Sequence, residues 1–587
     1  MKTLERSLIL FIVTALYCCS KKSDMGNNLN NGGGNNTNTT PYDSAYNPVD
    51  PAVTTTQGFF LDDWAAKSFT VPSFTPAPPV LTPATDTIKI DADIVLTKVS
   101  KYLFGANSNL WMGQVVTVPN LMQYITDLSP NVIRGPAGSV SDVYFWNATT
   151  TPADVPASLL DANGAATSTT YWYGQNTQSW TLALDNYYAL LQQTKSVGLQ
   201  TVNFGYSRYG TSANPVAAAA HLAADWVRYD NGRTKFWEIG NENYGNWESG
   251  YLIDTTLSTY KQPRIITGTD YGQNFLVYAD SMRNAAQSIG VDIKIGALLL
   301  GGPVNGSNQV GNWNSTALTA IGNNADFFII HDYYPDESYA TNAPGSQILS
   351  DAISVPATDM NYLNSNIPGS GVSLKPVAMT EFNISSQGSQ QQISFVNAMA
   401  GVLTDGELMK NHFGQGSRWD LANGWSNGND QGMLYNSANT GDPNPSETNW
   451  NPRASFYTLY YFQRFMGDRL VNSTSTNTSL SVYSSTFAAS NNIASVIVNT
   501  GTVDKVVDVN INHFPMGTNV YFYTLKGGTD NGEFSAKVSV NGVAASQAIG
   551  GPLNYASIPA SSTTRNGNNI ALYCPARSIV YMVVDKK

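Results

Sequence analysis

Cysteine and charged residues are both scarce in this chain of 587 residues. Only Cys18, Cys19 and Cys574 are cysteines. The first two lie in an N-terminal leader, so the body holds a single thiol and can form no internal disulfide. Lys, Arg, Asp and Glu make up 12% of the chain, against roughly 25% in ordinary domains. The sequence therefore predicts a surface that is mostly neutral and polar.

Excess positive charge and metal-binding patterns are absent as well. With a net charge of −11, neither nucleic acid nor an anionic membrane surface is expected as a partner, because both need a basic face. Neither a Gly-x-Ser-x-Gly elbow nor a phosphate-binding Gly-x-x-x-x-Gly-Lys loop occurs. No metal or other cofactor is expected, because metal-ligand spacing is missing among the four histidines, His221, His331, His412 and His513. A neutral, hydroxyl-rich ligand such as carbohydrate fits this composition, and 32 Tyr and 12 Trp could supply stacking surfaces.

Residues 1–19 predict a lipoprotein signal peptide. Lys2 and Arg6 precede the apolar run Leu8–Leu16, which is too short to span a bilayer as a permanent helix. The segment that follows resembles a bacterial lipobox in which Cys19 is the lipidated residue. A diacylated cysteine would provide the multiple buried chains that stable anchoring needs. We expect a lipid anchor as the only membrane contact, at the outer membrane or cell surface; the periplasmic face or plain secretion is the alternative.

A tether and docking segment is expected over residues 20–86. Residues 20–57 are rich in Gly and Asn and cannot bury enough apolar surface to order themselves. Residues 58–71 are too apolar for a tether and should dock on the body, and the Pro-rich run 72–84 should stiffen the approach. Residues 87–103 begin with a strand expected to join the C-terminal domain, because alternate residues are apolar at Ile88, Ile90, Ala92, Ile94 and Leu96.

Strand-like and helix-like stretches alternate from residue 104 to 466. This pattern is typical of an α/β domain with a parallel sheet and helical crossovers. Eight units predict a (β/α)8 TIM barrel, with strands at 104–109, 132–138, 200–204, 235–240, 293–300, 327–334, 375–384 and 416–420. Helices are expected at 120–128, 215–229, 275–289, 347–364, 391–408 and 453–465. From residue 467 to 587, short alternating strands predict an antiparallel β-sandwich.

Two of these strands end in a carboxylate. The first runs into Asn241 and Glu242, and the second carries Glu381. An ionised carboxylate inside a buried strand needs a partner, whereas the C-terminal ends of barrel strands are where catalytic groups gather. Two carboxylates across one cleft are what cleavage of a glycosidic bond requires. Taken singly, each glutamate is equally well explained as a solvated cap or a salt-bridge partner.

The segments Trp237-Glu-Ile-Gly-Asn-Glu242 and Thr380-Glu-Phe-Asn383 resemble the acid/base and nucleophile strands of clan A retaining glycoside hydrolases. In particular they resemble the family 51 α-L-arabinofuranosidases and heparanase-like relatives. The resemblance implies that Glu242 is the general acid/base on the fourth strand and Glu381 the nucleophile on the seventh. Family 51 typically reads Asp-Glu-Trp-Asn at the second segment, so arabinofuranosidase specificity stays open.

Further substrate-binding residues follow from position and resemblance. The family's Asn-Glu pair implies that Asn241 hydrogen-bonds a sugar hydroxyl, and its His-x-Tyr implies that His331 and Tyr333 border the nucleophile. Without the resemblance, core packing explains this His and Tyr equally well. Arg134 matches the Arg of the family's Arg-x-Pro-Gly-Gly, with Ala137 at the first Gly, and Asn107 belongs to the first strand. Candidate sugar platforms near strand ends are Trp111, Trp146, Trp247, Trp419 and Trp425.

The sequence thus predicts a retaining glycoside hydrolase of plant or algal polysaccharide, similar to the α-L-arabinofuranosidases. An endo-acting glycanase of the same clan, of the glucanase, xylanase or agarase type, is the enzymatic alternative. A surface lipoprotein that binds glycans without cleaving them is the non-enzymatic one. In each case the expected partner is a polysaccharide or oligosaccharide.

Overall fold

The computed structural model describes residues 46–587 except 305, 336–341, 427 and 437–440. The expected signal peptide, the lipidation of Cys19 and the tether up to residue 45 lie outside the described residues. Among the helices of the described part, none combines the length and the apolar character that crossing a bilayer requires.

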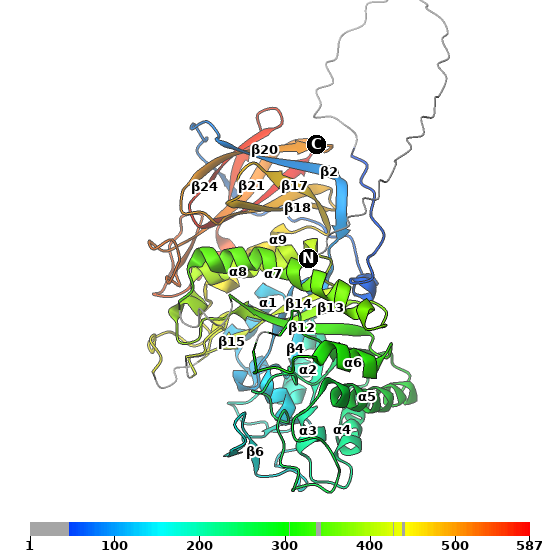
Figure 1. Cartoon of the computed structure of the whole chain (residues 1–587). Coiled ribbons are helices and arrows are strands. Elements are labelled where there is room, and N and C mark those ends of the chain that lie inside the picture. Colours follow the sequence, from blue (N-terminus) through cyan, green and yellow to red (C-terminus); the bar gives the residue numbers. More distant parts are fainter. Residues whose placement is uncertain (1–45, 305, 336–341, 427, 437–440) are drawn as a thin grey trace, which may run out of the picture. The chain divides into compact units, whose positions relative to one another are not determined.

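Eight parallel strands close into a barrel, which confirms the predicted TIM barrel (Figure 1). Each strand pairs with the next along the chain, and the last pairs with the first. Glu242 follows the fourth strand and Glu381 lies in the seventh. In order, the strands are β3 (Gly105–Asn107), β4 (Val132–Gly135), β9 (Val197–Val202), β10 (Thr234–Ile239), β11 (Lys294–Leu298), β12 (Phe327–Tyr334), β13 (Val377–Ile384) and β14 (Gln415–Arg418).

Helices connect the barrel strands. α4 shows how the local sequence defines one of them: the side chain of Asn214 accepts a hydrogen bond from the Ala217 amide, and Pro215 occupies the first turn. The sequence patterns did not predict the short helices α2, α3 and α6. The helices are α1 (Pro119–Leu128), α2 (Leu184–Thr194), α3 (Gly205–Tyr209), α4 (Pro215–Asp230), α5 (Gly268–Ser288), α6 (Trp313–Ile321), α7 (Gly345–Gly369), α8 (Phe395–Lys410) and α9 (Ala454–Phe465).

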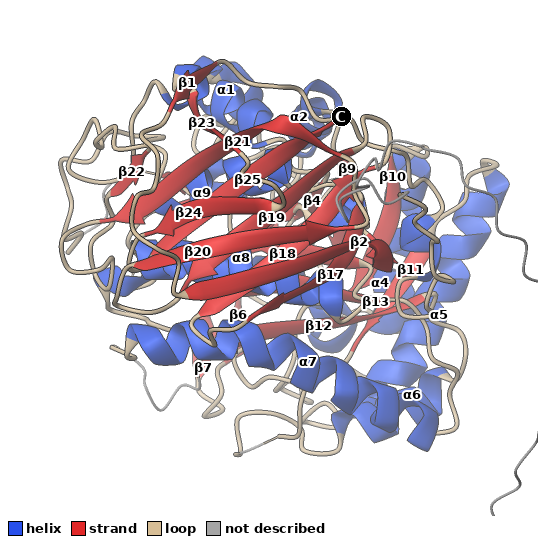
Figure 2. Cartoon of the chain, turned by 90° about the horizontal axis from the view of Figure 1, so that it is seen from above, coloured by secondary structure: helices blue, strands red, loops and turns tan. Residues whose placement is uncertain are grey.

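The C-terminal domain is a mostly antiparallel sheet of eleven strands that curls around one apolar core (Figure 2). The expected sandwich is thus a single continuous sheet, and its pairs β1–β23 and β2–β20 are parallel. The strand order is β1 (Phe74–Pro76), β23 (Ala560–Thr564), β21 (Met516–Gly527), β25 (Ser578–Lys586), β19 (Asn492–Asn499), β18 (Leu480–Phe487), β17 (Arg469–Ser475), β2 (Asp86–Lys98), β20 (Lys505–Asn512) and β24 (Asn569–Cys574), with β22 (Val538–Val540) beside β21.

The sheet domain and the barrel share a buried interface. On β25, Val580 faces the interior of the curled sheet, while Tyr581 belongs to the apolar cluster that continues into the barrel. The Tyr581 hydroxyl donates to the carbonyl of Thr458 in α9 over 2.7 Å. β25 is therefore apolar along most of its length, because both of its faces are buried.

β2 places the N-terminal part of the chain inside this sheet, between β17 and β20. Ile88 is buried as expected, but Ile94 and Leu96 are 49% and 38% exposed. The register against β17 shifts on both sides of Val471, and this irregularity turns Val95 inward instead. A period-two pattern cannot predict such a bulge.

The segment before β2 contacts the body at several points along its described length. The ring of Phe60 packs 5.1 Å from that of Phe236 in β10, as expected for a docking segment. Residues 46–57, which composition assigns to the tether, are held by Asp50, which pairs with Lys98 and Arg469. Part of the Pro-rich run forms the edge strand β1. Pro76 has no N–H group to donate, which an edge strand tolerates.

Candidate active site

Glu242 reaches the mouth of the barrel through a sharp turn after β10. Gly240 has a φ of +86°, and a Cβ there would lie 1.9 Å from Oδ1 of Asn243, so only glycine fits. Glu242 itself has a φ of +43°. A non-glycine residue in this left-handed region is uncommon and points to a functional constraint.

Glu381 reaches the same mouth through a bulge in β13. Ile330 pairs with Met379 and His331 pairs with Glu381, so Thr380 is an extra residue between the two pairs. Such bulges re-aim side chains and are frequent beside active sites.

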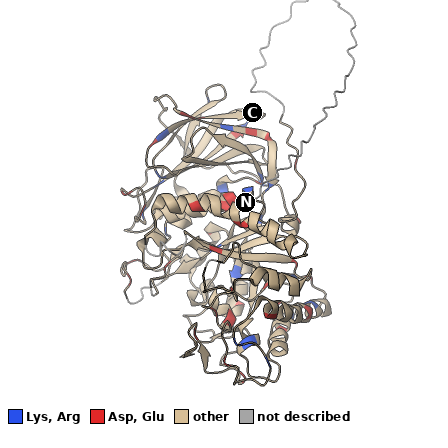
Figure 3. Cartoon of the chain, viewed as in Figure 1, with Lys and Arg blue, Asp and Glu red and all other residues tan. Residues whose placement is uncertain are grey.

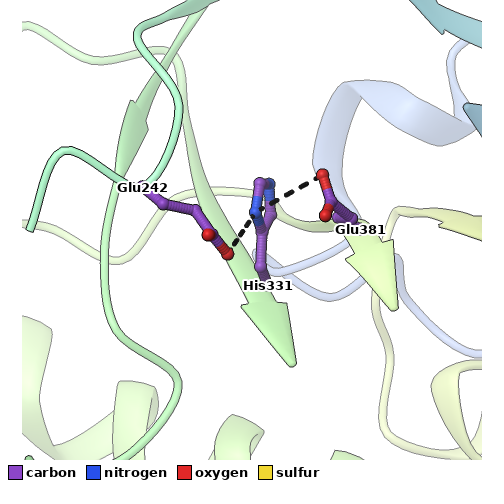
Figure 4. Close-up of side chains that lie close together, drawn as sticks. All are labelled: Glu242, His331 and Glu381. Carbon is purple, nitrogen blue, oxygen red and sulfur yellow. Dashed lines mark hydrogen bonds and ion pairs between the residues drawn. The ribbon is translucent and has the colours of Figure 1, made fainter. Parts of the chain in front are cut away.

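The two carboxylates meet across His331 (Figure 4). Nδ1 of His331 lies 3.0 Å from Oε1 of Glu242 and 3.8 Å from Oε2 of Glu381. One ligand atom of each of these three residues lies within 4.8 Å of the others. Retaining glycosidases keep their carboxyl groups about 5–5.5 Å apart, whereas inverting ones need about 6.5–9.5 Å. The separation fits a reaction that proceeds with retention.

Arg134 anchors this arrangement from β4. Its side chain is fully buried and lies 2.6 Å from Glu238 Oε2 and 2.9 Å from Glu381 Oε2. It also donates to Oδ1 of Asn107 over 3.0 Å and to Oδ1 of Asn241 over 2.8 Å. One guanidinium thus fixes two carboxylates and two amides, which is the forked geometry that arginine allows.

Asn107 also lies behind the reacting groups. Its amide nitrogen donates to the carbonyls of Thr380, Ser417 and Arg418 over 3.1, 3.2 and 3.1 Å. Both the oxygen and the nitrogen of the Asn107 side-chain amide thus form hydrogen bonds within the protein. This residue ties β3 to β13 and β14, and neither Asn107 nor Arg134 lines the pocket between the glutamates.

Histidine, threonine and tyrosine complete the surroundings of the glutamates. Nε2 of His331 lies 2.9 Å from the hydroxyl of Thr380, and the hydroxyl of Tyr333 donates to Oε1 of Glu381. A neutral imidazole carries one proton. The contact of Nε2 with Thr380 can therefore set whether Nδ1 faces Glu242 as a donor or as an acceptor.

Burial and polar contacts act against each other on the two glutamates. At Glu242, burial raises the pKa, but the contacts with His331 and Trp247 outweigh it, and the pKa is lowered. At Glu381, burial outweighs His331 and Arg134, and the pKa is raised. These directions are the reverse of those that an acid Glu242 and a nucleophile Glu381 require.

The pocket between the glutamates has a volume of about 490 Å³. Apart from the two glutamates, the residues described along its lining are uncharged, in keeping with the sparse charge of the chain (Figure 3). The lining residues are Gly138, Ser139, Asn241, Glu242, Tyr333, Glu381, Ser385, Ser386, Gln387, Trp419, Asn429 and Gln431. Serine, amide and indole groups of this kind suit the hydroxyls and apolar faces of a neutral sugar.

The candidate tryptophans take different positions. Trp419 lines the pocket, and Nε1 of Trp247 donates to Oε2 of Glu242 over 2.8 Å. The ring of Trp111 lies 6.5 Å from that of Trp419. Trp146 is buried against Trp226 in the core. Trp425 is not part of the described lining of this pocket.

Sequence analysis missed two buried carboxylates that support the site. Glu238 pairs with Arg134, and its place within the apolar β10 was the signal, because a buried carboxylate needs a partner. Glu248 accepts hydrogen bonds from Asn241 over 3.0 Å and from Ser139 over 2.7 Å. Burial, aided by Asp142 and Glu242, raises the pKa of Glu248 well above its usual value. No local pattern marks Glu248.

Glu242, His331 and Glu381 could together offer three ligand atoms to a metal ion. The cation of Arg134 already neutralises Glu381 at 2.9 Å, which disfavours a divalent ion in the same place.

Neither a protein-family model nor a curated protein matches the sequence. Solved structures do share the fold. The α-L-arabinofuranosidase from Thermotoga maritima matches with a TM-score of 0.57 and 15% identity, over 85% of this chain and 100% of that chain. The family 51 arabinofuranosidase from Xanthomonas axonopodis pv. citri matches with a TM-score of 0.56 and 13% identity, over 86% of this chain and 100% of that chain.

The chain has a clan A-like glycoside hydrolase fold. A family 44 xyloglucanase from Paenibacillus polymyxa, solved with xyloglucan, also matches, with a TM-score of 0.54, 10% identity, and coverage of 86% of this chain and 100% of that chain. The likeness thus extends over barrel and sheet domain together and includes proteins of more than one specificity.

Proposed function

We propose that this protein is a retaining glycoside hydrolase that cleaves a neutral plant or algal polysaccharide by double displacement. The observation that carries the proposal is the meeting of Glu242 and Glu381 at His331, with one atom of each of the three residues within 4.8 Å of the others. Carboxylates at this spacing can share one anomeric carbon but leave no room for the water that an inverting reaction places between them.

In the first step, a carboxylate oxygen of Glu381 bonds to the anomeric carbon as the glycosidic carbon–oxygen bond breaks. The proton of Glu242 passes to the departing oxygen, and a covalent glycosyl-enzyme forms. In the second step, Glu242 takes a proton from water, and the resulting hydroxide displaces Glu381 from the anomeric carbon. Both glutamates then regain their starting states.

These roles require bound substrate to raise the pKa of Glu242 relative to that of Glu381. Positive charge that develops at the anomeric carbon favours ionised Glu381, which already faces Arg134 at 2.9 Å. His331 can adapt to a protonated Glu242 by accepting at Nδ1, while Nε2 donates to Thr380 over 2.9 Å. Glu242 thus keeps its contact with His331 in either protonation state.

The test is hydrolysis of aryl glycosides and polysaccharides, beginning with arabinofuranosides and xyloglucan, because an arabinofuranosidase and a xyloglucanase share the fold. Glu381→Ala should abolish turnover on every substrate. Glu242→Gln should spare mainly aryl glycosides whose leaving group needs no protonation. Glu533→Gln, a carboxylate of the sheet domain, is the control and should retain full activity. Proton NMR of the first product should show retained anomeric configuration; inversion, or full activity of Glu381→Ala, would remove the mechanism.

We also propose that lipidation of Cys19 anchors the enzyme at the outer surface of a Gram-negative cell. The support is the leader sequence of residues 1–19. Cys19→Ala should move the protein from the membrane fraction to the soluble fraction. Protease treatment of intact cells should degrade the wild-type protein, and resistance would place it on the inner face instead.

A further inference from the structure

A second cavity adjoins the pocket between the glutamates. Its volume is about 710 Å³, and Trp419 and Asn429 line both cavities. Neither Glu242 nor Glu381 contributes to it. The site therefore extends beyond Glu242 and Glu381 on the side where Trp419 lies.

Four indole rings, of which that of Trp419 is the first, form a row that leads away from the pocket between the glutamates. The ring of Trp419 lies 6.5 Å from that of Trp111, Trp111 lies 6.3 Å from Trp172, and Trp172 lies 5.7 Å from Trp180. Three of these rings, those of Trp111, Trp180 and Trp419, line the second cavity. Trp180 is 52% exposed. Core packing does not explain an indole that leaves half of its surface in water.

Trp450 adds an indole to the same cavity from another part of the chain. Its backbone has a φ of +67°. A bulky residue in the left-handed region is a genuine outlier, and such strain persists where the surrounding structure fixes it for a purpose.

The described lining of the second cavity contains no charged residue. Its polar groups are mainly amides, such as those of Asn423 and Asn436, which can both donate to and accept from hydroxyl groups. A uronic acid or a sulfated sugar would meet no cation in this lining. The cavity suits a chain of neutral sugars, with apolar ring faces on indoles and hydroxyls on amides.

The position of the row in the barrel tells which part of the substrate it faces. Trp419 follows β14, which lies four strands from β10 in the closed barrel of eight, and Glu242 follows β10. The two residues therefore come from opposite sides of the mouth. Glu242 protonates the departing oxygen, so the leaving group lies on its side, next to Trp247. The tryptophan row lies on the side of the sugar that Glu381 retains.

We propose that this row binds at least one further neutral sugar on the retained side of the cleaved bond, so that the enzyme cuts within a chain. The inference rests on the proposed function, because Glu242 and Glu381 define the two sides. An enzyme that removes one terminal sugar has no use for a binding surface beyond the retained residue. The first products should accordingly be oligosaccharides.

Trp180→Ala is the decisive variant, because an exposed ring at the far end of the row can be removed without disturbing the core. Wild type and variant are compared on neutral oligosaccharides of two to six units and on the matching aryl monoglycoside. We expect kcat/KM to rise with chain length in the wild type. The variant should lose roughly tenfold or more, about 1.4 kcal/mol, on the longer chains, and nothing on the aryl monoglycoside.

Phe534→Ala removes an aromatic ring of similar exposure, 44%, from the sheet domain and is the matched control. It should behave as the wild type on every substrate. Equal kcat/KM of wild type and Trp180→Ala on all chain lengths, or release of monosaccharide alone, would overturn the inference while hydrolysis itself stands.

Calorimetric binding of the same oligosaccharides to Glu381→Ala separates the two proposals. Longer chains should bind more tightly, and this gain should disappear with Trp180→Ala. If that is found but the wild type hydrolyses nothing, the sugar-binding row stands and the proposed reaction is overturned. No dependence of binding on chain length would count against the row. Carboxylated oligosaccharides of equal length should bind more weakly than neutral ones, and tighter binding would contradict the assignment to neutral sugars.

Discussion

Nη1 of Arg134 lies 2.9 Å from Oε2 of Glu381. The side chain of Arg134 is fully buried, and that of Glu381 is 8% exposed. A buried carboxylate that must act as an ionised nucleophile needs such a cation, because burial raises its pKa. Arg134 pairs at the same time with Glu238, so its charge is shared between a structural partner and a reacting one.

Arg134→Met should remove this cation and leave Glu238 and Glu381 unpaired. We expect a loss of about 3–5 kcal/mol in the free energy of unfolding, as for other broken buried ion pairs. Turnover should fall at least roughly 100-fold, because the geometry of Asn241 and Glu381 loosens. Denaturant melts and kinetics measure the two effects. Arg134→Lys keeps the charge and should fold better; activity of Arg134→Met close to wild type would contradict the role.

Tyr333→Phe should destabilise the ionised form of Glu381 relative to the protonated form. The Tyr333 hydroxyl donates to this carboxylate, and the contact acts to lower the pKa of Glu381. Without it the pKa of Glu381 rises, so the acidic limb of the kcat/KM profile should move to higher pH. Loss of a hydrogen bond to a charged group, about 1.5–3 kcal/mol, should lower kcat/KM about 10- to 100-fold. An unchanged acidic limb would show that this limb does not report Glu381.

Glu248 should act by holding Asn241. Burial raises the pKa of Glu248 well above its usual value, and its Oε1 accepts from Asn241 over 3.0 Å. Glu248→Gln preserves this acceptor without charge and should keep nearly wild-type kinetics. Glu248→Ala leaves the side chain of Asn241 held by Arg134 but not by Glu248, and should raise KM. Equal KM in both variants, measured on one oligosaccharide, would exclude a positioning role.

Asp142 should make stability fall as pH rises. Burial raises its pKa from 3.8 to about 7, so between these values the folded state holds a proton that the unfolded state has lost. Its contribution is complete below pH 3.8 and is lost as pH rises to about 7, by about 1.4 kcal/mol for each pH unit.

Asp142→Asn should remove that dependence. Oδ1 can still accept from the Gly205 amide, and Oδ1 of Asn243, which has no hydrogen-bond partner among the described residues, can turn to accept from the new amide. The free energy of unfolding should be measured at pH 5 and pH 7. Relative to the wild type, the variant should be more stable at pH 7 than at pH 5. Asp62→Asn, an exposed carboxylate, is the control and should follow the wild type. A wild type whose stability rises between these pH values would contradict the assignment.

Local patterns in the sequence determined the fold class and singled out Glu242 and Glu381. Alternating strand and helix signals predicted the barrel, and each glutamate stood where an apolar run ended, because a strand that faces a core excludes an unpaired charge. The scarcity of charged residues predicted a mostly neutral, polar surface. The bulge that exposes Ile94 and Leu96 was not predicted, because register depends on the neighbouring strand.

The tertiary structure alone decided which distant groups meet. Closure of eight strands places Glu242 within hydrogen-bond distance of His331, opposite Trp419, and a bulge at Thr380 turns Glu381 toward the same mouth. The pairing of Glu238 with Arg134 and the row that ends at Trp180 depend on the same closure. These contacts join segments far apart in the chain, whereas sequence periodicity reports only which face of its own element a residue occupies.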